Sequence, residues 1–567
     1  MAEHTGSPGA AAVAWTPAAK PRRHTKGRQL DPGALAEVER LIGGAPLRRD
    51  LLIEHLHRIQ DAHGHLSARH LRALAEHMGL SQAEVFEVAS FYHHFDIVRE
   101  GEAAPPALTV RVCDSLSCAL AGGEALADRL QAALPGVRVQ RVACVGRCDR
   151  APVAVVGTSP LERADAAAVV AAVAAGQTAA PLPPAAIGLA AYRAGGGYGL
   201  LAQLREGRLT AEGVIATLSD AGLRGLGGAG FPAGRKWQAV LGFPGPRLMT
   251  VNADEGEPGT FKDRFHLERD PHRFLEGMLI AAHVVAAERI YIYLRDEYAG
   301  LRALLAREIA ALTAAGLVPE GLIDLRRGAG AYICGEESAM LESIEGKRGL
   351  PRHRPPFIAE VGLFGRPTLN HNVETLFWLR DILERGADWF AGQGMNGARG
   401  LRSWSVSGRV RNPGVILAPA GITAAELIAR AGGMAEGHRF KAYLPGGASG
   451  GILPARLSDL PLDFGTLAAH GAFVGSHAVV VLSDRDDMAA VARNLLRFFK
   501  LESCGQCTPC RAGTEKALAL MSEARWPRAL LEELAEVMAD ASICGLGQAA
   551  PNPFLSVLRF FAEEAGQ

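Results

Sequence analysis

Four cysteines near the C-terminus have the spacing of ligands for an iron–sulfur cubane: Cys504, Cys507, Cys510 and Cys544. The first three form a C-x2-C-x2-C run, and a tight turn of this kind suits three corners of a [4Fe–4S] cluster. Cys544 follows 34 residues later and can supply the fourth thiolate from a neighbouring helix. A zinc site usually pairs two separate C-x2-C knuckles, and disulfides are rare in a reducing compartment. The spacing therefore predicts a cubane and makes electron transfer the first hypothesis.

A second quartet, Cys113-x4-Cys118 and Cys144-x3-Cys148, follows two predicted strands. Two cysteines from each of two loops can hold a [2Fe–2S] rhomb, although zinc knuckles would also fit this spacing. Because the chain also carries the cubane motif, we favour iron. The ninth cysteine, Cys334, belongs to neither quartet and is predicted to be a small packed side chain.

A glycine-rich segment, 224–237, contains a G-x-G-x-x-G pattern at Gly225, Gly227 and Gly230. The pattern follows a predicted helix rather than a strand, so it lacks the context of a dinucleotide-binding fingerprint. Successive glycines still let the backbone approach a flat ring or a pyrophosphate, and Lys236 offers a charge for an anion. The segment is therefore a candidate cofactor loop.

Three acidic residues, Asp254, Glu255 and Glu257, leave the carboxyl end of a predicted strand in the segment 252–259. Ligands of a doubly wound sheet bind at this end of the strands. The carboxylates could bind a hard cation or accept hydrogen bonds from a ligand's N–H groups and ribose hydroxyls. A solvated surface loop is the alternative interpretation.

The segment 328–338 opens a helix that is predicted to continue to Ile344. A helix N-terminus attracts phosphate. Glu336 and Glu337 would repel a phosphate here, so we expect these two side chains to face hydroxyls or ring N–H groups.

Length and charge limit the protein class. A chain of 567 residues is too long for one core. Sixty basic residues balance sixty acidic ones, so no global field favours nucleic acid or an anionic membrane. No export signal is visible in residues 1–29, and apolar stretches such as 278–294 are interrupted by charges. These features predict a multidomain protein of the cytoplasm.

The elements that position the motifs are predicted from apolar periodicity and turn residues. The fold class is multidomain α/β. The expected order is a disordered tail (1–29), a helical bundle (30–106), a small α/β domain of thioredoxin-like size (107–176), a proline-rich linker (177–190), a doubly wound parallel α/β domain (191–400), a small β-grasp-like domain (401–486) and a C-terminal helical domain (487–567).

Six histidines are scattered over the predicted bundle: His55, His57, His63, His65, His70 and His77. Their spacing along the helices matches no consistent set of metal ligands. The sequence therefore predicts no metal site there.

Together, the segments 225–237, 252–259, 328–338 and 370–375 and the C-terminal quartet resemble the NADH-oxidising flavoprotein subunit of respiratory complex I. The resemblance runs from Ala191 to the C-terminus. Residues 30–176 resemble its thioredoxin-like [2Fe–2S] partner subunit, fused here through the linker. Similar modules serve soluble NAD-dependent formate dehydrogenases and NAD-reducing hydrogenases.

The resemblance implies FMN, NAD(H), [4Fe–4S] and [2Fe–2S] as cofactors, with no general acid or base among the catalytic residues. The residues implied to hold FMN are Gly225, Gly227, Lys236, Asn252, Asp254, Tyr332, Gly335, Glu336 and Asn372. Those implied to line the NADH site are Phe231, Glu257, Glu337 and Phe357.

Some positions depart from the complex I pattern. Leu226 and His371 stand where complex I members usually have Arg and Asn, and Ala239 stands where some relatives stack an aromatic ring. The segments 544–553 and 90–96 look more like the soluble formate dehydrogenase version. The implied function is a diaphorase subunit partnered by a molybdenum- or tungsten-pterin formate dehydrogenase subunit. A hydrogenase or complex I module is the alternative, and a zinc-binding assembly scaffold is the non-enzymatic one.

Overall fold

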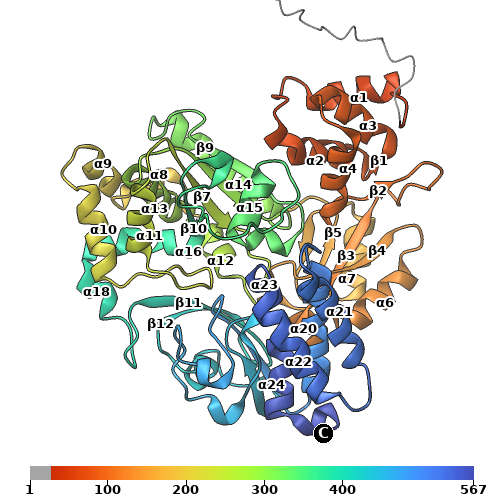
Figure 1. Cartoon of the computed structure of the whole chain (residues 1–567), viewed down its shortest axis with the longest axis vertical. Coiled ribbons are helices and arrows are strands. Elements are labelled where there is room, and N and C mark those ends of the chain that lie inside the picture. The colour runs from red at the N-terminus through yellow and green to blue at the C-terminus, as the bar shows by residue number, and fades with distance from the viewer. Residues whose placement is uncertain (1–26, 185) are drawn as a thin grey trace, which may run out of the picture.

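The computed structural model describes residues 27–184 and 186–567, so most of the predicted tail lies outside the described residues. Figure 1 shows the N-terminal helices and the orange sheet on one side and the yellow-green α/β part on the other. The cyan strands and blue helices lie below them. The segments that carry chemistry therefore come from different parts of the sequence and meet near the centre.

The N-terminal bundle consists of four helices: α1 (Pro32–Ile42), α2 (Leu52–His63), α3 (Ala68–Met78) and α4 (Gln82–Phe91). Side chains cap three of the helices, and Ser81 forms a full capping box with Glu84. The predicted apolar stripe is buried. Its core is continuous with that of the parallel sheet and of the C-terminal helices, because one cluster of contacting residues includes Leu56, Tyr293 and Phe499. The bundle thus depends on its neighbours for burial.

The second part is a four-stranded sheet in the order β4-β3-β5-β6. Its elements are β3 (Thr109–Cys113), α5 (Leu116–Leu120), α6 (Gly123–Ala133), β4 (Arg138–Val142), β5 (Ala154–Val156), β6 (Ser159–Leu161) and α7 (Ala166–Ala174). The strands β3 and β4 are parallel neighbours. Their carboxyl ends therefore lie side by side, which places the two cysteine pairs at one edge.

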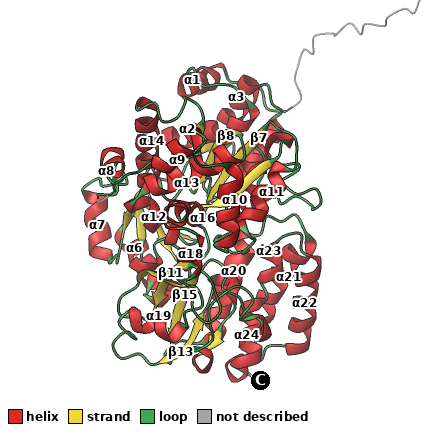
Figure 2. Cartoon of the chain, turned by 90° about the vertical axis from the view of Figure 1, so that its left-hand side faces the viewer, coloured by secondary structure: helices red, strands yellow, loops and turns green. Residues whose placement is uncertain are grey.

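The largest part surrounds a parallel sheet in the order β10-β7-β8-β9. The strands are β7 (Arg247–Ala253), β8 (Ala287–Leu294), β9 (Ile323–Arg327) and β10 (Thr368–Asn372). Alternate residues of β8 face two different cores: Ile290 and Ile292 pack in one, Tyr291 and Tyr293 in the other. Both faces are covered, as Figure 2 shows for the yellow strands among red helices. The predicted parallel sheet with two buried faces is present.

The helices of this part are α8 (Leu189–Ala194), α9 (Gly199–Arg205), α10 (Ala211–Asp220), α11 (Ala233–Leu241), α12 (Lys262–Arg269), α13 (Pro271–Val284), α14 (Ala299–Ala314), α15 (Glu337–Ile344), α16 (Val373–Phe377), α17 (Leu379–Arg385) and α18 (Ala387–Ala391). The predicted helix 273–287 ends earlier, because Ala286 turns with a φ of 51° and β8 begins at Ala287. Helix α8 also takes the last two residues of the predicted linker.

The strand order reverses beside β7. From β7 the chain moves to β8 and then β9 on one side, and it later returns to add β10 on the other side. In doubly wound sheets, ligands bind at the carboxyl ends of the strands where the order reverses. Asn252 and Asn372 are register partners at these ends.

A five-stranded mixed sheet and a helical domain complete the chain. The sheet order is β12-β11-β15-β13-β14, from β11 (Leu401–Gly408), β12 (Gly414–Pro419), β13 (Phe440–Leu444), β14 (Leu453–Pro454) and β15 (Ala478–Ser483), with α19 (Ala424–Arg430). The sequence did not predict β13 or β14. The last helices are α20 (Met488–Glu502), α21 (Thr508–Leu520), α22 (Arg528–Ala541), α23 (Gly545–Ala549) and α24 (Asn552–Phe560).

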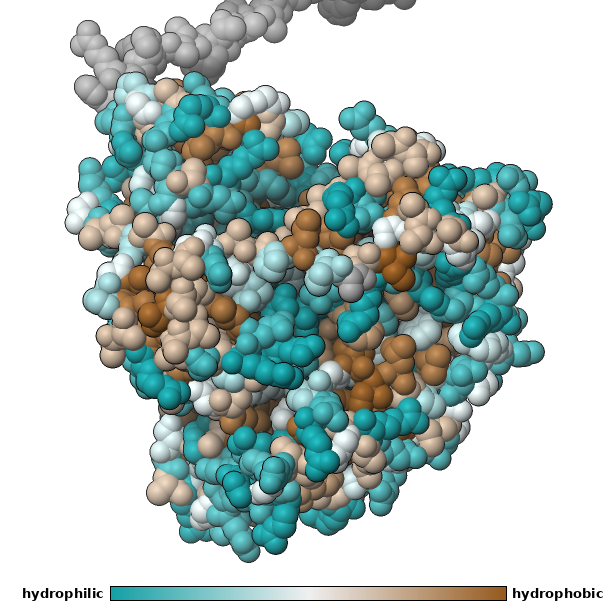
Figure 3. Space-filling model, turned by 180° about the vertical axis from the view of Figure 1, so that it is seen from behind, coloured by the Kyte–Doolittle hydropathy of each residue, from teal (hydrophilic) through white to brown (hydrophobic). Residues whose placement is uncertain are grey.

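Apolar surface is distributed in small areas on the face seen in Figure 3, where brown side chains lie in separate patches among teal ones. Within the described ranges, no helix is both long and apolar enough to cross a membrane.

Candidate functional site

The N-terminal cysteine quartet lies at the edge formed by β3 and β4, and all four side chains are buried. Cys113 ends β3 and Cys144 follows β4 by two residues, whereas Cys118 lies within α5 rather than in the expected loop. The sulfurs of Cys144 and Cys148 are 3.4 Å apart. Contacts with Cys113 and Cys148, together with the charge of Arg295, hold the pKa of Cys144 well below its usual value. Contacts with neighbouring thiols raise the pKa values of Cys113 and Cys148 well above the usual value, so Cys144 is the cysteine of this group that favours the metal-binding thiolate form.

The C-terminal quartet gathers at the start of α21. Cys504 follows α20, Cys507 is the N-cap of α21, and Cys510 lies in its first turn. Cys544 is the N-cap of the short helix α23, which packs on α21. Burial raises the pKa of Cys510 to about 11 and that of Cys544 to about 12. Cys544 thus comes from a neighbouring helix, as expected, and its role as the fourth cluster ligand stays a prediction.

The cysteine sulfurs can be compared with the thiolates around one zinc ion. Thiolates around one tetrahedral zinc ion, each about 2.3 Å from the metal, lie about 3.8 Å from one another. Among residues 27–184 and 186–567, no three cysteine sulfurs lie within 4.8 Å of one another. The described sulfurs therefore do not form a compact group of three around one ion position, although the Cys144 and Cys148 sulfurs lie 3.4 Å apart.

The predicted flavin residues meet where the strand order reverses. Asn252 Nδ2 donates to the Gly335 carbonyl at 2.7 Å, and Asn372 Nδ2 donates to Asp263 Oδ2 at 2.6 Å. A Cβ atom at Gly227 would lie 3.0 Å from the Asn372 Cβ, so any larger residue there would require Asn372 to shift. Figure 1 shows β7 and β10 close together, and β10 runs directly into α16.

The acidic segment after β7 is not a solvated loop. Glu255 is buried and accepts hydrogen bonds from the backbone N–H groups of Asp263 and Arg264, at 2.7 and 3.1 Å. Glu257 is buried and accepts from the Ser449 N–H at 2.9 Å. Asp254, Glu255 and Glu257 do not converge on a common cation position within the described chain. The Glu255 and Glu257 carboxylates are hydrogen-bonded to protein groups, so their predicted contacts with a ligand stay a prediction.

Asp254 has an unused acceptor. Its Oδ2 atom is buried and has no hydrogen-bond partner in the described part of the chain, and burial raises the pKa of this carboxyl well above the usual value. A buried oxygen without a partner costs free energy until a donor reaches it. A bound flavin carries N–H and hydroxyl donors, so the residues at this position fit FMN.

Glu336 caps the start of α15. The Glu336 carboxylate caps the helix by accepting from the N–H groups of Ser338 and Ala339, at 3.0 and 2.8 Å. It also pairs with Arg354. Since the carboxylate already neutralises the helix N-terminus, this end is not a phosphate site. The structure gives Glu336 a capping role that the sequence interpretation did not include.

Lys236 and Glu337 are partners. The Lys236 ammonium lies 3.4 Å from Glu337 Oε2 and donates to the Asn370 carbonyl at 3.1 Å. This contact joins the glycine-rich segment to the start of α15.

Phe231 and Phe357 are 47% and 58% exposed, so both rings are available to stack on a planar ligand. Their predicted role in the nucleotide site stays a prediction.

Trp237 ends the glycine-rich segment but does not face a ligand position. Its side chain is fully buried and donates from Nε1 to His371 Nε2 at 2.6 Å. Burial holds the pKa of His371 well below its usual value, so its neutral ring accepts this bond. Ala239, on the same helix, is exposed. Trp237 therefore belongs to the core beneath the loop.

A buried charge network beneath Asn372 was missed by the sequence analysis. Lys262 lies 2.8 Å from Asp263 Oδ1 and 3.1 Å from Glu374 Oε2, and it donates to Asn372 Oδ1 at 3.1 Å. Burial alone would lower the pKa of Lys262, but the two carboxylates raise it above its usual value. The only sequence signal was Glu374 within the segment 370–375.

Direct contacts connect the predicted flavin loops with each of the two cysteine quartets. The Gly259 N–H donates to Cys148 Sγ at 3.3 Å, and Arg295 donates to the carbonyls of Cys144 and Glu255. On the other side, the Tyr332 N–H donates to Glu502 Oε2 at 2.9 Å, two residues before the first cubane cysteine. The proposed flavin loops thus lie between the two cysteine quartets.

Comparisons with known families match this arrangement. The matching models are "Thioredoxin-like [2Fe-2S] ferredoxin" over residues 38–177, "Nuo51 FMN-binding domain" over 218–381, "SLBB domain" over 405–453 and "NADH-ubiquinone oxidoreductase-F iron-sulfur binding region" over 490–567. An NADH-quinone oxidoreductase subunit of Rhizobium meliloti is 41% identical over 393 residues, which are 66% of this chain and 93% of that protein. The chain belongs to the complex I flavoprotein family.

Two further relatives of the family are hydrogenase subunits. NADP-reducing hydrogenase subunit HndC of Solidesulfovibrio fructosivorans is 40% identical, over 63% of this chain and 76% of that one. A crystal structure of an NAD+-reducing [NiFe]-hydrogenase in the H2-reduced state contains a chain with a TM-score of 0.80 and 32% identity, covering 92% of this chain and 93% of that one. The chain is a fused NAD-dependent oxidoreductase subunit that binds FMN, NAD(H), a [2Fe–2S] cluster and a [4Fe–4S] cluster.

A cleft of about 750 Å³ lies outside the predicted FMN and NADH sites. It opens between the thioredoxin-like part, the proline-rich linker, α12 and the start of β12, and it is lined by arginines and carboxylates, among them Arg147 and Glu268. None of the thirteen predicted flavin and nucleotide residues lines it. The cleft is therefore not the predicted FMN or NADH site.

Proposed function

We propose that this chain is the diaphorase subunit of a formate dehydrogenase, which exchanges hydride between NAD(H) and FMN and exchanges electrons with a separate molybdenum- or tungsten-pterin subunit in the cytoplasm. Bound FMN supplies the hydride exchange with NAD(H) and the change to one-electron transfer. The chain itself supplies position and electrostatics. The observation that carries the proposal is the placement of the flavin loops between two cysteine quartets, through the Gly259–Cys148 and Tyr332–Glu502 contacts.

The proposed flavin site is formed by Gly225, Gly227, Lys236, Asn252, Asp254, Tyr332, Gly335, Glu336 and Asn372. Asp254 Oδ2 is its free buried acceptor, and Lys236 is its cation. Glu336 acts by capping α15 and so fixes the loop that carries Tyr332 and Gly335. The proposed nucleotide site adds Phe231, Glu257, Glu337 and Phe357.

Formate is the proposed electron donor because the segments 90–96 and 544–553 resemble the soluble formate dehydrogenase form. The first segment contacts the flavin-loop region directly: the His94 N–H donates to the Ala329 carbonyl at 3.1 Å, and Tyr92 Oη donates to the Lys347 carbonyl at 2.7 Å. The second segment begins at the cluster ligand Cys544. Both segments therefore lie where they would influence the electron path.

A hydrogenase partner is the second candidate, and the specific observation that favours it is the likeness of nearly the whole chain to a subunit of an NAD+-reducing [NiFe]-hydrogenase. The test is the metal content and donor specificity of the native complex. Molybdenum or tungsten with formate-dependent NAD+ reduction supports the first proposal. Nickel with hydrogen-dependent reduction replaces it with the second, and NADH oxidation with neither donor refutes both.

A further inference from the structure

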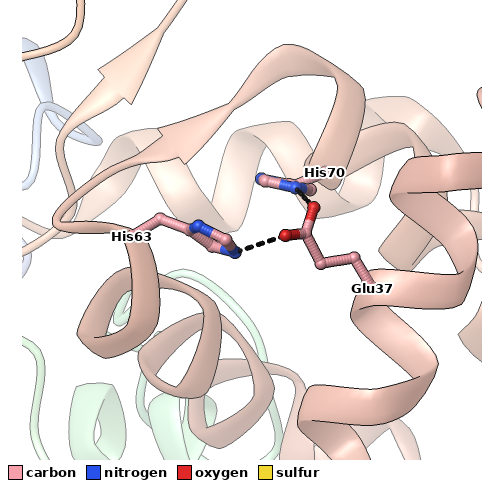
Figure 4. Close-up of side chains that lie close together, drawn as sticks. All are labelled: Glu37, His63 and His70. Carbon is pink, nitrogen blue, oxygen red and sulfur yellow. Dashed lines mark hydrogen bonds and ion pairs between the residues drawn. The ribbon is translucent and has the colours of Figure 1, made fainter.

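We propose that Glu37, His63 and His70 form a binding site for one divalent transition-metal ion such as Zn²⁺. The three residues come from three helices: Glu37 from α1, His63 from the last position of α2, and His70 from the first turn of α3. Figure 4 shows that both imidazole rings point toward the Glu37 carboxylate, each toward a different oxygen. Two imidazoles and one carboxylate are a donor set that suits zinc and its neighbours in the first transition row.

The distances fit a metal ion shared by the three side chains better than a simple ion pair between His63 and Glu37. One ligand atom from each residue lies within 4.8 Å of the other two. His63 Nε2 is 3.7 Å from Glu37 Oε1, which is too long for a hydrogen bond. Two ligands that share a tetrahedral zinc ion at about 2.0–2.1 Å lie about 3.4 Å apart. The His63–Glu37 separation is close to that value.

The Nε2 atom of His63 is not engaged in a hydrogen bond within the described chain. This atom is also buried. Such an atom costs free energy unless a donor or a metal ion reaches it. His70 Nε2 lies 2.8 Å from Glu37 Oε2, so metal binding displaces the proton that this hydrogen bond shares.

The ring arrangement keeps both ligands on one side of the carboxylate. The centroids of His63 and His70 are 4.5 Å apart, with an angle of 23° between the ring planes. His70 is 2% exposed, so the protein already bears the cost of desolvating it. Arg69 Nη2 lies 3.7 Å from Glu37 Oε2 and is the cation that Zn²⁺ must compete with.

The proposed ion would join three helices of the bundle, far from the cysteine quartets in the sequence. Binding would therefore stabilise the bundle against local opening without changing the clusters. The spacing rule applied to the sequence could not detect this cluster, because its residues come from three helices rather than from one.

The test is equilibrium dialysis of the full holoprotein against Zn²⁺, followed by zinc and iron analysis after gel filtration. The expected result is one zinc per chain beyond the iron content, with at least about a tenfold weaker affinity in Glu37→Gln and His63→Gln. His77→Ala is the matched control, because His77 lies on α3 and faces Glu39 of α1 at 3.8 Å without a third ligand. Unchanged iron and flavin contents show that each variant is folded.

Equal zinc binding by the wild type, Glu37→Gln and His63→Gln would overturn the proposal, as would the absence of any added zinc in the wild type. A second readout is the temperature of unfolding. Zinc is expected to raise it in the wild type and in His77→Ala, and to leave it unchanged in His63→Gln. A zinc-dependent rise in all three proteins would also contradict the site.

Discussion

Replacement of Lys262 by Met is expected to destabilise the flavin-binding part strongly. The Lys262, Asp263 and Glu374 side chains are 1%, 5% and 0% exposed, so they form a fully buried ionic group. The Lys262→Met change keeps the length of the side chain and removes its charge, which leaves two carboxylates uncompensated. The same change removes the donor to Asn372 Oδ1, a predicted flavin contact.

The magnitude follows from burial. Removing one partner of a buried ion pair costs about 3–5 kcal/mol, because the remaining charge stays buried without compensation. An exposed pair contributes about 1 kcal/mol or less. For a domain of this size, a loss of 1 kcal/mol lowers the unfolding midpoint by about 2–4 °C. Lys262→Met should therefore release flavin at a temperature roughly 10 °C below that of the wild type.

The assay is flavin fluorescence during slow heating of the holoprotein. Lys500→Met is the matched control, since Lys500 pairs with Glu515 at 3.3 Å and both side chains are exposed. This control should shift the midpoint by at most about 3 °C. The triple change Lys262→Met, Asp263→Asn and Glu374→Gln should recover part of the loss, because it removes the whole ionic group. Equal midpoints for Lys262→Met and Lys500→Met would refute the reasoning.

Three further outcomes test the cluster and nucleotide assignments. Cys507→Ala should lose about four irons per chain and change the low-temperature paramagnetic spectrum of the reduced protein, and an unchanged spectrum would contradict the cubane. Cys144→Ala should lose about two irons while NADH oxidation by dyes persists, because dyes can accept electrons from the flavin; loss of dye reduction with flavin retained would oppose this. Glu337→Gln should raise KM for NADH with flavin bound, whereas Lys236→Ala should weaken flavin retention, and equal, negligible effects would refute the site model.

Much of the fold could be predicted because its strands and helices have strong local signals. The segment 289–294 is apolar and β-branched, and 301–315 has helical spacing, so the alternation of strands and helices is readable from the chain. The strands β13 and β14 were missed. Residues Leu453 and Pro454 form a two-residue strand that exists only through pairing with Ala442 and Tyr443, and pairing across the chain leaves no periodic signal.

The candidate site was predictable where chemistry depends on residue type and spacing. The cysteine quartets could be recognised by residue type and spacing. So could the glycines where the backbone passes close to another residue, as Gly227 does beside Asn372. The roles of the buried charged residues could not be predicted from the sequence. Lys262 and Glu255 resemble exposed charges in any local window, and only the packing of α12 against the β7 loop shows that they are internal partners. The Glu336 cap was likewise hidden, because an acidic residue at a helix start fits either a cap or a ligand contact.

The contacts around the β7 loop suggest why a [2Fe–2S] domain is useful within the same chain. Cys148 Sγ accepts from the Gly259 N–H, and Glu257 of the same loop is held by Ser449 of the mixed-sheet part. A change at the cluster would therefore reach the loop through one hydrogen bond, while the loop stays anchored from another domain. A hydrogen bond to a cluster sulfur is one of the terms that set its reduction potential. If Cys148 binds the cluster as predicted, a substitution at Gly259 should also change the environment of the [2Fe–2S] cluster, and the single chain keeps this contact intramolecular.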